Sequence, residues 1–552
     1  MRTYQRPTQT LRAAEGDAES AIVQVALRPR ERGNASGRVA SGDMPSAEPW
    51  WKSAVIYQIY PRSFCDTNAD GVGDLEGIRS HLDHLELLGV DAVWISPFFT
   101  SPMKDYGYDV ADYCDVDPLF GDLDDFDRLV ADAHGRNIKV LIDWVPNHSS
   151  DLHPWFVESR SSRDNPKADW YWWRDADPDD PMKPPNNWVA AFTGGPAWTW
   201  DETRQQWYLH NFLAEQPDLN WRNPEVVAAM HDTLRFWLDR GVDGFRMDVV
   251  HLIGKTEDLP DGRVDDEGRV YSAHDYDGTH GMLRDIRVLM DSYDGDRMMV
   301  GEVYILSTKR VAKYYGDNDE LHLSFNFPPL HAPWESSAWR RRIDRVIEEL
   351  DPRNAWPSWV ISNHDNPRHR TRYGSEAKAR AAAMLLLTLR GTPFLFAGEE
   401  LGLEDAVIPP ERVLDPGGRD GCRAPIPWTE DDSHGWGVAD PWLPWPPDAG
   451  GRSAAAQEGD DASVLALYRR VVEARRASPA LQVGDFTWLS APDEVLAYER
   501  TRDGDRRVVL VNQSGTLQGV ETAAAGLAVE VTSDGAHFDG RTLAPWQAVL
   551  LR

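Results

Sequence analysis

The chain has 552 residues, too many for one simple hydrophobic core, so two or three domains are expected. It carries 58 Lys and Arg against 90 Asp and Glu, a formal net charge of −32 at pH 7. Because no basic patch suited to phosphate stands out, nucleic acid is disfavoured as a partner. No stretch approaches the roughly 18 apolar residues that cross a membrane, so no span is predicted. The 24 Trp mildly favour carbohydrate, because indole faces pack on sugar rings as well as in cores.

The three cysteines are odd in number and far apart, without the spacing of a metal site: Cys65, Cys114 and Cys422. Free thiols of this kind are typical of a reducing compartment. The best apolar run near the N-terminus, residues 21–27, is interrupted by Gln24 and is followed by no small-residue cleavage site. This pattern disfavours a signal peptide. We therefore expect a cytoplasmic protein, with residues 1–47 as a polar, poorly ordered extension.

From residue 48 onwards, strand patterns and helix patterns alternate. Buried strands are predicted at 53–64, 90–96 and 138–145. Apolar residues at helical spacing predict helices at 75–88 and 126–134, ended by Gly89 and Gly135. Such an alternation is typical of a parallel sheet covered by helices.

The loop between the first strand and the first helix carries polar side chains at alternate positions around glycine. Asp66, Asn68, Asp70 and Asp74 form this pattern, and Val72 lies among them. The spacing resembles the start of a calcium-binding loop. It is equally typical of an Asx-rich turn in which Asp74 caps the next helix. The residues alone leave both interpretations open.

Residues 149–220 break the alternation and are rich in Pro, Trp and Asp. A segment of this length is either a lid or a small inserted domain. The alternation resumes at Asn223–Pro224, because Asn is a favourable helix cap and Pro fits the first turn. Further strands are predicted at 242–248, 297–302, 321–327, 358–364 and 393–397, which brings their number to eight.

Three of these strands end on acids that a buried strand does not explain: Asp248, Glu302 and Asp365. They lie 54 and 63 residues apart, which fits βα units of roughly 30 residues plus one long loop. The carboxyl ends of barrel strands meet at one mouth, where active sites lie. Because three carboxylates in one place repel one another, a catalytic role is favoured over a stabilising one. The alternative for Asp248 is a purely structural ion pair with Arg246.

After a helix at 463–477 the pattern changes to period two, and residues 508–511 follow an Asp503–Gly504 turn. The predicted fold is therefore α/β: a (β/α)8 TIM barrel with an inserted domain after strand 3 and a C-terminal antiparallel β-sandwich. The predicted barrel occupies residues 48–148 and 221–478, with the inserted domain at 149–220 and the sandwich at 479–552.

Four segments at the strand ends resemble the signature regions of the α-amylase family of glycoside hydrolases: Asp143–His148, Gly244–Asp248, Gly301–Tyr304 and Asn363–Asp365. Gln216–Trp221 resembles the additional motif of the α-glucosidase and oligo-1,6-glucosidase branch. The similarity runs from about Trp50 to the C-terminus. Five motifs in the same order and at compatible spacing are highly specific.

The resemblance implies a role for each matched residue. Asp248 is the expected nucleophile, held ionised by Arg246, and Glu302 is the expected general acid/base, kept protonated until needed. Asp365 is expected to brace the distorted sugar ring. Other contacts to the substrate are implied for Asp105, Tyr108, Asp143, His148, Phe192, Val249, His364 and Arg423. Within this set, the motif around Arg423 implies that it pairs with Asp105. Phe192 could instead pack in the core of the inserted domain.

Two further expectations come from the same branch. The loop at 66–74 can hold a structural calcium ion through the side chains of Asp66, Asn68, Asp70 and Asp74 and the Val72 carbonyl. Val249 directly follows the nucleophile, and a Val at this place goes with α-1,6 cleavage, whereas Ala or Thr goes with α-1,4 cleavage. No organic cofactor is implied.

The expected activity is that of an exo-acting retaining α-glucosidase. Such an enzyme releases α-glucose from the non-reducing end of short α-glucosides such as maltose or isomaltose, through α-1,4 and/or α-1,6 linkages. The alternatives are an oligo-1,6-glucosidase proper and a transglycosylating or isomerising relative such as trehalose synthase. A non-enzymatic relative, like the heavy subunits of amino-acid transporters, is disfavoured because those proteins carry a membrane helix and lose catalytic acids. A monomer or a small homo-oligomer is expected.

Overall fold

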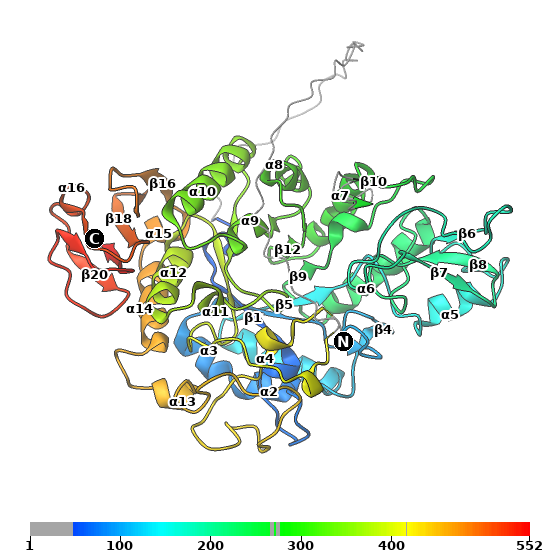
Figure 1. Ribbon diagram of the computed structural model, residues 1–552, viewed down its shortest axis with the longest axis horizontal. Coiled ribbons are helices and arrows are strands. Elements are labelled where there is room, and N and C mark those ends of the chain that lie inside the picture. Colours follow the sequence, from blue (N-terminus) through cyan, green and yellow to red (C-terminus); the bar gives the residue numbers. More distant parts are fainter. Residues whose placement is uncertain (1–47, 265–269, 272–275, 416) are drawn as a thin grey trace, which may run out of the picture. The chain divides into compact units, whose positions relative to one another are not determined.

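A computed structural model of the protein describes residues 48–264, 270–271, 276–415 and 417–552 (Figure 1). The extension expected at residues 1–47 lies outside the described residues. Within them, no helix combines the length and the apolar character that a bilayer crossing demands. All three cysteines lie in this part of the chain and are free thiols.

Eight strands form the central sheet in the order β13-β12-β9-β5-β2-β1-β15-β14. They are β1 (Ile56–Ile59), β2 (Ala92–Ile95), β5 (Lys139–Trp144), β9 (Gly244–Met247), β12 (Met298–Gly301), β13 (Leu323–Ser324), β14 (Ser358–Val360) and β15 (Thr392–Phe396). Each neighbouring pair is parallel. The first and last strands of this order, β13 and β14, are joined by a side-chain hydrogen bond. The Ser358 hydroxyl of β14 donates to the Ser324 carbonyl of β13 at 2.7 Å, which brings the sheet close to a closed barrel. The predicted TIM barrel is confirmed.

Several of the helices around the sheet begin at residues whose side chains cap them. The Asn223 side chain accepts a hydrogen bond from the Glu225 amide at 2.8 Å and so caps α6 (Pro224–Asp239). Asp122 and Asp125 form a capping box at the start of α4 (Leu123–Gly135). The other long barrel helices are α7 (Gly278–Asp291), α10 (Ser336–Leu350), α12 (Glu376–Thr388) and α14 (Val464–Arg476).

One predicted helix is divided in the structure. The segment expected as a single helix at 75–88 forms α2 (Leu75–Ser80) and α3 (Leu82–Leu88). The break falls at His81, whose φ and ψ of −112° and 14° are not helical. The His81 ring packs on Trp428 at a centroid distance of 3.9 Å, a tertiary contact that the helical spacing of leucines could not indicate.

The register of three neighbouring strands determines where the site lies. Asp143 of β5 lies opposite Arg246 of β9, which in turn lies opposite Val300 of β12. The Asp248 amide donates to the Trp144 carbonyl at 2.9 Å, and the Glu302 amide donates to the Met247 carbonyl at 2.8 Å. The residues just beyond these strands therefore stand level at the carboxyl-terminal rim of the barrel.

The segment predicted as an inserted domain has little regular structure. It contains α5 (Pro154–Ser161) and a three-stranded antiparallel sheet of β6 (Trp173–Arg174), β8 (Gln206–Leu209) and β7 (Trp198–Asp201), drawn in cyan in Figure 1. Its core is a cluster of buried tryptophans: Trp172, Trp188, Trp198 and Trp207. Many of the tryptophans in this segment are thus used for packing and are not exposed to a ligand.

The C-terminal part contains two antiparallel sheets. The larger has the order β16-β17-β18-β22-β20 and the smaller pairs β19 with β21. Apolar residues of both sheets share one core, including Val508, Leu543 and Val549. The prediction of a C-terminal β domain is confirmed, with a second layer of only two strands. The strands are β16 (Asp485–Trp488), β17 (Val495–Arg502), β18 (Asp505–Asn512), β19 (Gln518–Gly519), β20 (Val529–Thr532), β21 (Thr542–Leu543) and β22 (Ala548–Leu551).

Gly244 begins the strand that carries the central site residues, and it has no room for a side chain. A Cβ atom added there would collide with the Met298 carbonyl oxygen and lie 2.9 Å from the Met298 Cγ atom. We expect Gly244→Ala to lower the free energy of unfolding by about 1–3 kcal/mol, because β9 and β12 must move apart. Thermal unfolding measures the change. Gly135→Ala is the matched control, since an added Cβ meets nothing within 4 Å there. Equal melting temperatures for the two variants would contradict this account of the packing.

Candidate active site

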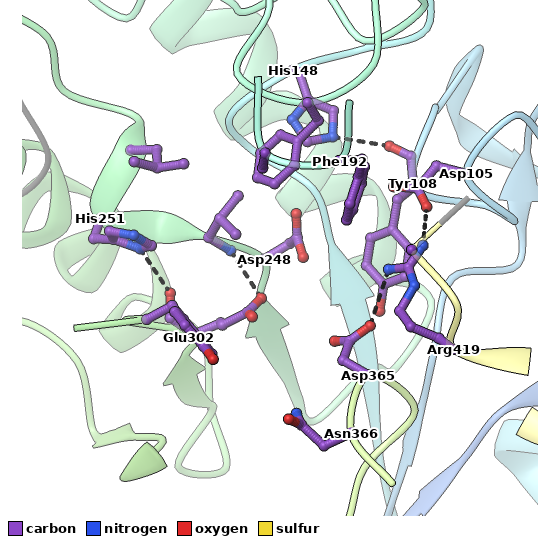
Figure 2. A pocket seen from close by; sticks show the side chains of 16 residues that line it. Asp105, Tyr108, His148, Phe192, Asp248, His251, Glu302, Asp365, Asn366 and Arg419 are labelled. Atoms are coloured by element: carbon purple, nitrogen blue, oxygen red, sulfur yellow. Dashed lines mark hydrogen bonds and ion pairs between the residues drawn. The ribbon is translucent and has the colours of Figure 1, made fainter. Parts of the chain in front are cut away.

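A pocket of about 540 Å³ opens at the carboxyl-terminal rim of the barrel (Figure 2). Eight residues expected from the sequence line it: Asp105, Tyr108, His148, Phe192, Asp248, Val249, Glu302 and Asp365. Figure 2 shows Asp105 and Arg419 together at one end, Glu302 and His251 at the other, and Asp248 between them. The predicted acids from three separate strands therefore do meet in one pocket.

Arg246 lies directly behind the pocket and contacts three carboxylates. Its Nη1 donates to Asp143 at 2.7 Å and to Asp248 at 2.8 Å, and its Nη2 donates to Glu302. The side chain is only 2% exposed. A planar guanidinium presents donors on two nitrogens, so it holds Asp248 and Glu302 side by side.

This arrangement has more negative than positive charge. Burial raises the pKa of Asp143 to about 7 and raises the pKa of Asp248 well above its ordinary range, although Arg246 opposes both shifts. The nearby Glu302 carboxylate and a hydrogen bond with it also raise the pKa of Asp248. Arg246 was expected to hold Asp248 ionised; it acts in that direction, but burial and the neighbouring carboxylates outweigh it. The cluster therefore favours holding a proton.

Asp365 has the opposite electrostatic environment. Burial raises its pKa, but His364 and the guanidinium groups of Arg419 and Arg423 lower it further, so that the net shift is downward. Arg419 donates to Asp365 at 3.1 Å and Arg423 donates to it at 3.2 Å. The pocket thus places Asp365, whose pKa is lowered, opposite Asp248, whose pKa is raised.

One end of the pocket is closed by an ion pair that corrects a sequence expectation. The Arg419 Nη2 atom donates to Asp105 at 2.7 Å, whereas Arg423 was expected to make this contact. Arg423 instead lies behind the pocket and donates to the His364 carbonyl at 2.8 Å. The turn η6 (Asp420–Arg423) separates the two arginines and directs them differently. Asp415 supports Arg419 through a 2.6 Å contact.

The two histidines occupy different positions. His148 lines the pocket, and its Nε2 lies 3.1 Å from the Tyr108 carbonyl. Burial lowers the pKa of His148 to about 4, so it is neutral at pH 7 and its Nε2–H donates to that carbonyl. His364 is not among the lining residues. Its Nε2 lies 2.5 Å from the Tyr108 hydroxyl, and the two rings stack at 5.5 Å. His364 therefore positions Tyr108 from behind.

Comparison with known proteins agrees with this geometry. The sequence model of the family described as Alpha amylase, catalytic domain matches residues 58–484. A protein from Rhizobium meliloti (strain 1021) named probable alpha-glucosidase is 44% identical over 501 residues, covering 84% of this chain and 89% of that protein. This chain belongs to the α-amylase family. An oligo-1,6-glucosidase from Parageobacillus thermoglucosidasius is 36% identical over 515 residues, covering 84% of this chain and 90% of that protein. The family member described here thus falls in the α-glucosidase and oligo-1,6-glucosidase branch.

A solved structure extends the comparison with the α-amylase family. The crystal structure of an alpha-glucosyl transfer enzyme, XgtA, superposes with a TM-score of 0.86 at 41% sequence identity, covering 92% of this chain and 99% of that one. The likeness includes nearly the whole described fold and is not confined to the barrel.

Phe192 and Val249, two of the expected residues, lie on different sides of this family member's pocket. Phe192 lines the closed end, where the Arg419 guanidinium lies 4.7 Å from its ring. Val249 lines the other side, with an amide 3.3 Å from a Glu302 carboxylate oxygen. Its φ of 33° is rare for a β-branched residue and marks local backbone strain beside the acids.

Sequence reasoning missed half of the lining residues. They are Ala191, Phe212, His251, Leu252, Tyr304, Asn366, Gly417 and Arg419. Two of them lie at recognised motifs without having been given a role: Tyr304 is the last residue of the segment that contains Glu302, and Asn366 directly follows Asp365. Position directly after a strand-end acid was therefore a usable signal. No comparable signal indicated Phe212 or Gly417, which lie in long irregular segments.

In the predicted calcium loop, backbone amides donate hydrogen bonds to the acidic side chains. Asp66 accepts from the amides of Asn68 and Ala69 at 2.9 and 2.7 Å, and Asp74 accepts from the Gly77 amide at 2.6 Å as the cap of α2. These are the contacts of the Asx-turn interpretation. Over the described ranges, no group of three or more His, Cys, Asp and Glu side chains is placed to hold a metal. The loop nevertheless retains five oxygen donors, the ligand type that calcium prefers.

The pairing of Arg419 with Asp105 gives a test that separates the two arginines. We expect Arg419→Gln to lower kcat/KM for short α-glucosides by about ten- to a hundredfold, because a buried charge-assisted hydrogen bond contributes about 1.5–3 kcal/mol. Steady-state kinetics measures the change. Arg412→Gln, which removes an exposed ion pair with Asp440, is the control. Wild-type kinetics in Arg419→Gln would mean that this end of the pocket does not bind sugar.

Proposed function

We propose that this member of the family is an exo-acting retaining α-glucosidase that releases α-glucose from the non-reducing end of short α-glucosides. The observation that carries the proposal is the pocket itself. It is closed at one end by Asp105 and Arg419, and Asp248 and Glu302 lie beyond that end. A terminal glucose that fills the closed end would present its C1 atom to the two acids.

The proposed first step breaks the glycosidic bond. An ionised Asp248 oxygen attacks C1 while Glu302 donates its proton to the leaving oxygen, which gives a glucosyl ester on Asp248 and a free aglycone alcohol. The side-by-side placement of the two carboxyls on Arg246 supports attack by the enzyme over attack by water, since an inverting mechanism needs room for water between them. The proton that this cluster favours must sit on Glu302 when the bond breaks.

The proposed second step releases glucose. Glu302, now ionised, takes a proton from water, and the water oxygen attacks C1 and displaces Asp248. The second displacement restores the α configuration. Asp365 is kept ionised by Arg419 and Arg423, so it accepts hydrogen bonds from sugar hydroxyls and favours the electron-poor ring of the transition state.

The closed end supports exo action on short substrates. A polymer threaded through the pocket would have to pass the Asp105–Arg419 ion pair, which Phe192 covers. Maltose, isomaltose and short oligosaccharides need to place only one glucose in the pocket. Starch is therefore proposed as a poor substrate.

A second candidate function is transfer of the glucosyl unit to another sugar. The specific observation in its favour is the likeness to the alpha-glucosyl transfer enzyme XgtA. Both reactions share the glucosyl ester and differ in what attacks it. Product NMR on maltose and on isomaltose separates them, because hydrolysis gives only glucose whereas transfer gives new disaccharides or longer products.

The proposal has two further parts, a cellular location and a structural ion. The three free thiols support a cytoplasmic location, because secreted proteins commonly oxidise such groups. The donor set at 66–74 supports a structural calcium ion held by Asp66, Asn68, Asp70, Asp74 and the Val72 carbonyl. That ion would stabilise the loop and take no part in the reaction.

The proposed roles of the acids predict the effect of removing each one. We expect Glu302→Gln and Asp248→Asn to lower kcat by at least about 1000-fold, since the first removes the transferable proton and the second removes the nucleophile. Initial rates with maltose and isomaltose measure the loss. Glu257→Gln, on the exposed partner of Arg222, is the control.

In wild-type reactions, NMR within the first turnovers should show α-glucose before mutarotation, and β-glucose appearing first would contradict the double displacement.

The position of Val249 predicts the linkage preference. Its branched side chain borders the leaving-group side, where a 1,6-linked aglycone can swing clear through its extra rotatable bond but a 1,4-linked one cannot. We expect appreciable isomaltose hydrolysis by the wild type. We expect Val249→Ala to raise the maltose-to-isomaltose ratio of kcat/KM about tenfold, within the roughly 1–3 kcal/mol that such pocket changes produce. Val288→Ala, an exposed valine on α7, is the control. An unchanged ratio would show that the aglycone does not contact Val249.

The proposed calcium ion predicts a change in thermal stability. We expect the melting temperature to be several degrees higher with calcium than with chelator, because an ion that binds only the folded loop stabilises it. Asp70→Asn should reduce the shift, whereas Asp115→Asn, on the exposed face of β4 (Asp112–Val116), should leave it intact. Equal melting temperatures with calcium and with chelator would remove the ion from the proposal.

A further inference from the structure

Gln58 is a buried polar side chain on the first barrel strand. It belongs to β1 and is 1% exposed. Its Nε2 donates to the Ser96 hydroxyl at 3.1 Å and lies 2.7 Å from Nδ1 of His364. An amide buried without partners is costly, and here both N–H groups of the amide nitrogen have a partner. One of the two partners is a histidine that lies behind the acids of the pocket.

The contact with Gln58 places the proton of the His364 ring. Burial lowers the pKa of His364 to about 3, so the ring is neutral at pH 7, with hydrogen on one nitrogen and a lone pair on the other. The amide nitrogen of Gln58 can only donate, so Nδ1 accepts and the proton lies on Nε2. There it faces the Tyr108 hydroxyl at 2.5 Å and an Asp365 oxygen at 3.4 Å. A lone pair at Nε2 would repel that carboxylate.

The charged groups around the ring keep it neutral. They are Asp365, Arg246, Arg419 and Arg423. The three guanidinium groups add to the effect of burial and disfavour a second proton, whereas Asp365 acts in the opposite direction. Because His364 carries a single proton, the variable that remains is which of its two nitrogens holds it.

The position of this proton determines where the Tyr108 hydroxyl directs its own. An oxygen that accepts from Nε2–H of His364 is free to donate, and it donates to Asp143 at 3.2 Å. Asp143 also accepts from Trp94 Nε1 at 3.3 Å and from Arg246 at 2.7 Å. Each of these donors favours the ionised form of Asp143. If the histidine proton lay on Nδ1, the Tyr108 hydroxyl would donate to the ring, and Asp143 would lose one of these three donors.

The geometry points to Gln58 as a positioning residue that keeps the proton of the acid cluster off Asp143, through the two rings that lie between them. Asp143, Asp248 and Glu302 are all bound by the same guanidinium, and the cluster favours holding a proton. The inference rests on the proposed function, in which that proton must sit on Glu302 when the bond breaks. A proton on Asp143 would leave Glu302 without one to donate and would weaken the hold on Arg246.

The position of the proton on His364 can be measured directly. In protein labelled with ¹⁵N-histidine, the shifts of the two ring nitrogens differ between the two tautomers. The signals of His364 are those missing from both His364→Asn and His364→Gln. We expect the proton on Nε2 between about pH 6 and 8. A proton on Nδ1 in the wild type would overturn the inference, whether or not the enzyme is active and whether or not any variant of Gln58 folds.

Gln58→Glu keeps the size of the side chain and replaces the donor by a carboxyl group. At low pH the carboxyl group and the His364 ring share one proton, and Nε2 carries a hydrogen in either arrangement. As the pH rises and this proton leaves, the carboxylate can only accept, so the ring proton moves to Nδ1. We expect kcat/KM for the faster of maltose and isomaltose to fall at least about tenfold relative to wild type between about pH 5 and 9, with the same midpoint as the change in the NMR signals.

Gln513→Glu is the matched control. It makes the same substitution at a glutamine that is 3% exposed and lies just beyond β18 in the C-terminal domain. Its ratio of kcat/KM to the wild-type value should be the same at every pH. The comparison separates the effect of a carboxyl group at Gln58 from that of any buried carboxyl group.

The remaining outcomes in Gln58→Glu each contradict one step of the inference. A tautomer change without loss of activity would show that catalysis does not depend on the ring proton. Loss by one factor at every pH would show a packing effect. A proton that stays on Nε2 throughout would show that Gln58 does not place it. If the wild type releases glucose from neither disaccharide, the proposed function fails, and NMR of the wild type still decides which tautomer Gln58 selects.

Discussion

A single buried guanidinium holds the centre of this protein together. Arg246 contacts Asp143 on the strand to one side, Asp248 at the end of its own strand and Glu302 beyond the strand to the other side. Taking such a group out of water is costly unless charged partners compensate for the lost hydration. The match here requires β5, β9 and β12 to be neighbours in a fixed register. The contacts of this one guanidinium therefore depend both on the order of the barrel strands and on the placement of the acids.

The barrel and its acids could be predicted because they depend on local patterns. A buried strand that ends on an acid is visible in the sequence at Asp248, Glu302 and Asp365, and parallel strands bring such ends together without further information. The alternation of strands and helices was also sufficient to predict the central sheet. These features can be predicted because the residue that follows a buried strand in the sequence also lies at the end of that strand in the fold.

Contacts between distant segments could not be predicted in the same way. Arg419 and Arg423 lie four residues apart in one loop, and nothing in their spacing shows which one turns towards Asp105; the turn at 420–423 decides it. His364 follows a strand like the acids do, yet it lies behind Tyr108 because Gln58 of β1 binds its other nitrogen at 2.7 Å. The break of the first helix at His81 depends likewise on a ring from Trp428.

The closed end at Asp105 and Arg419 also fixes the order in which molecules can leave. A glucosyl unit seated against a blocked wall has one exit, and the departing half of the substrate occupies that exit until it diffuses away. In the proposed mechanism, the two half-reactions would then alternate through the same opening, and free glucose would remain bound until the aglycone has left. Under the proposed double displacement, this architecture would give ping-pong order with glucose as the last product released. It also makes glucose a competitor for the free enzyme, so accumulated product would itself slow turnover.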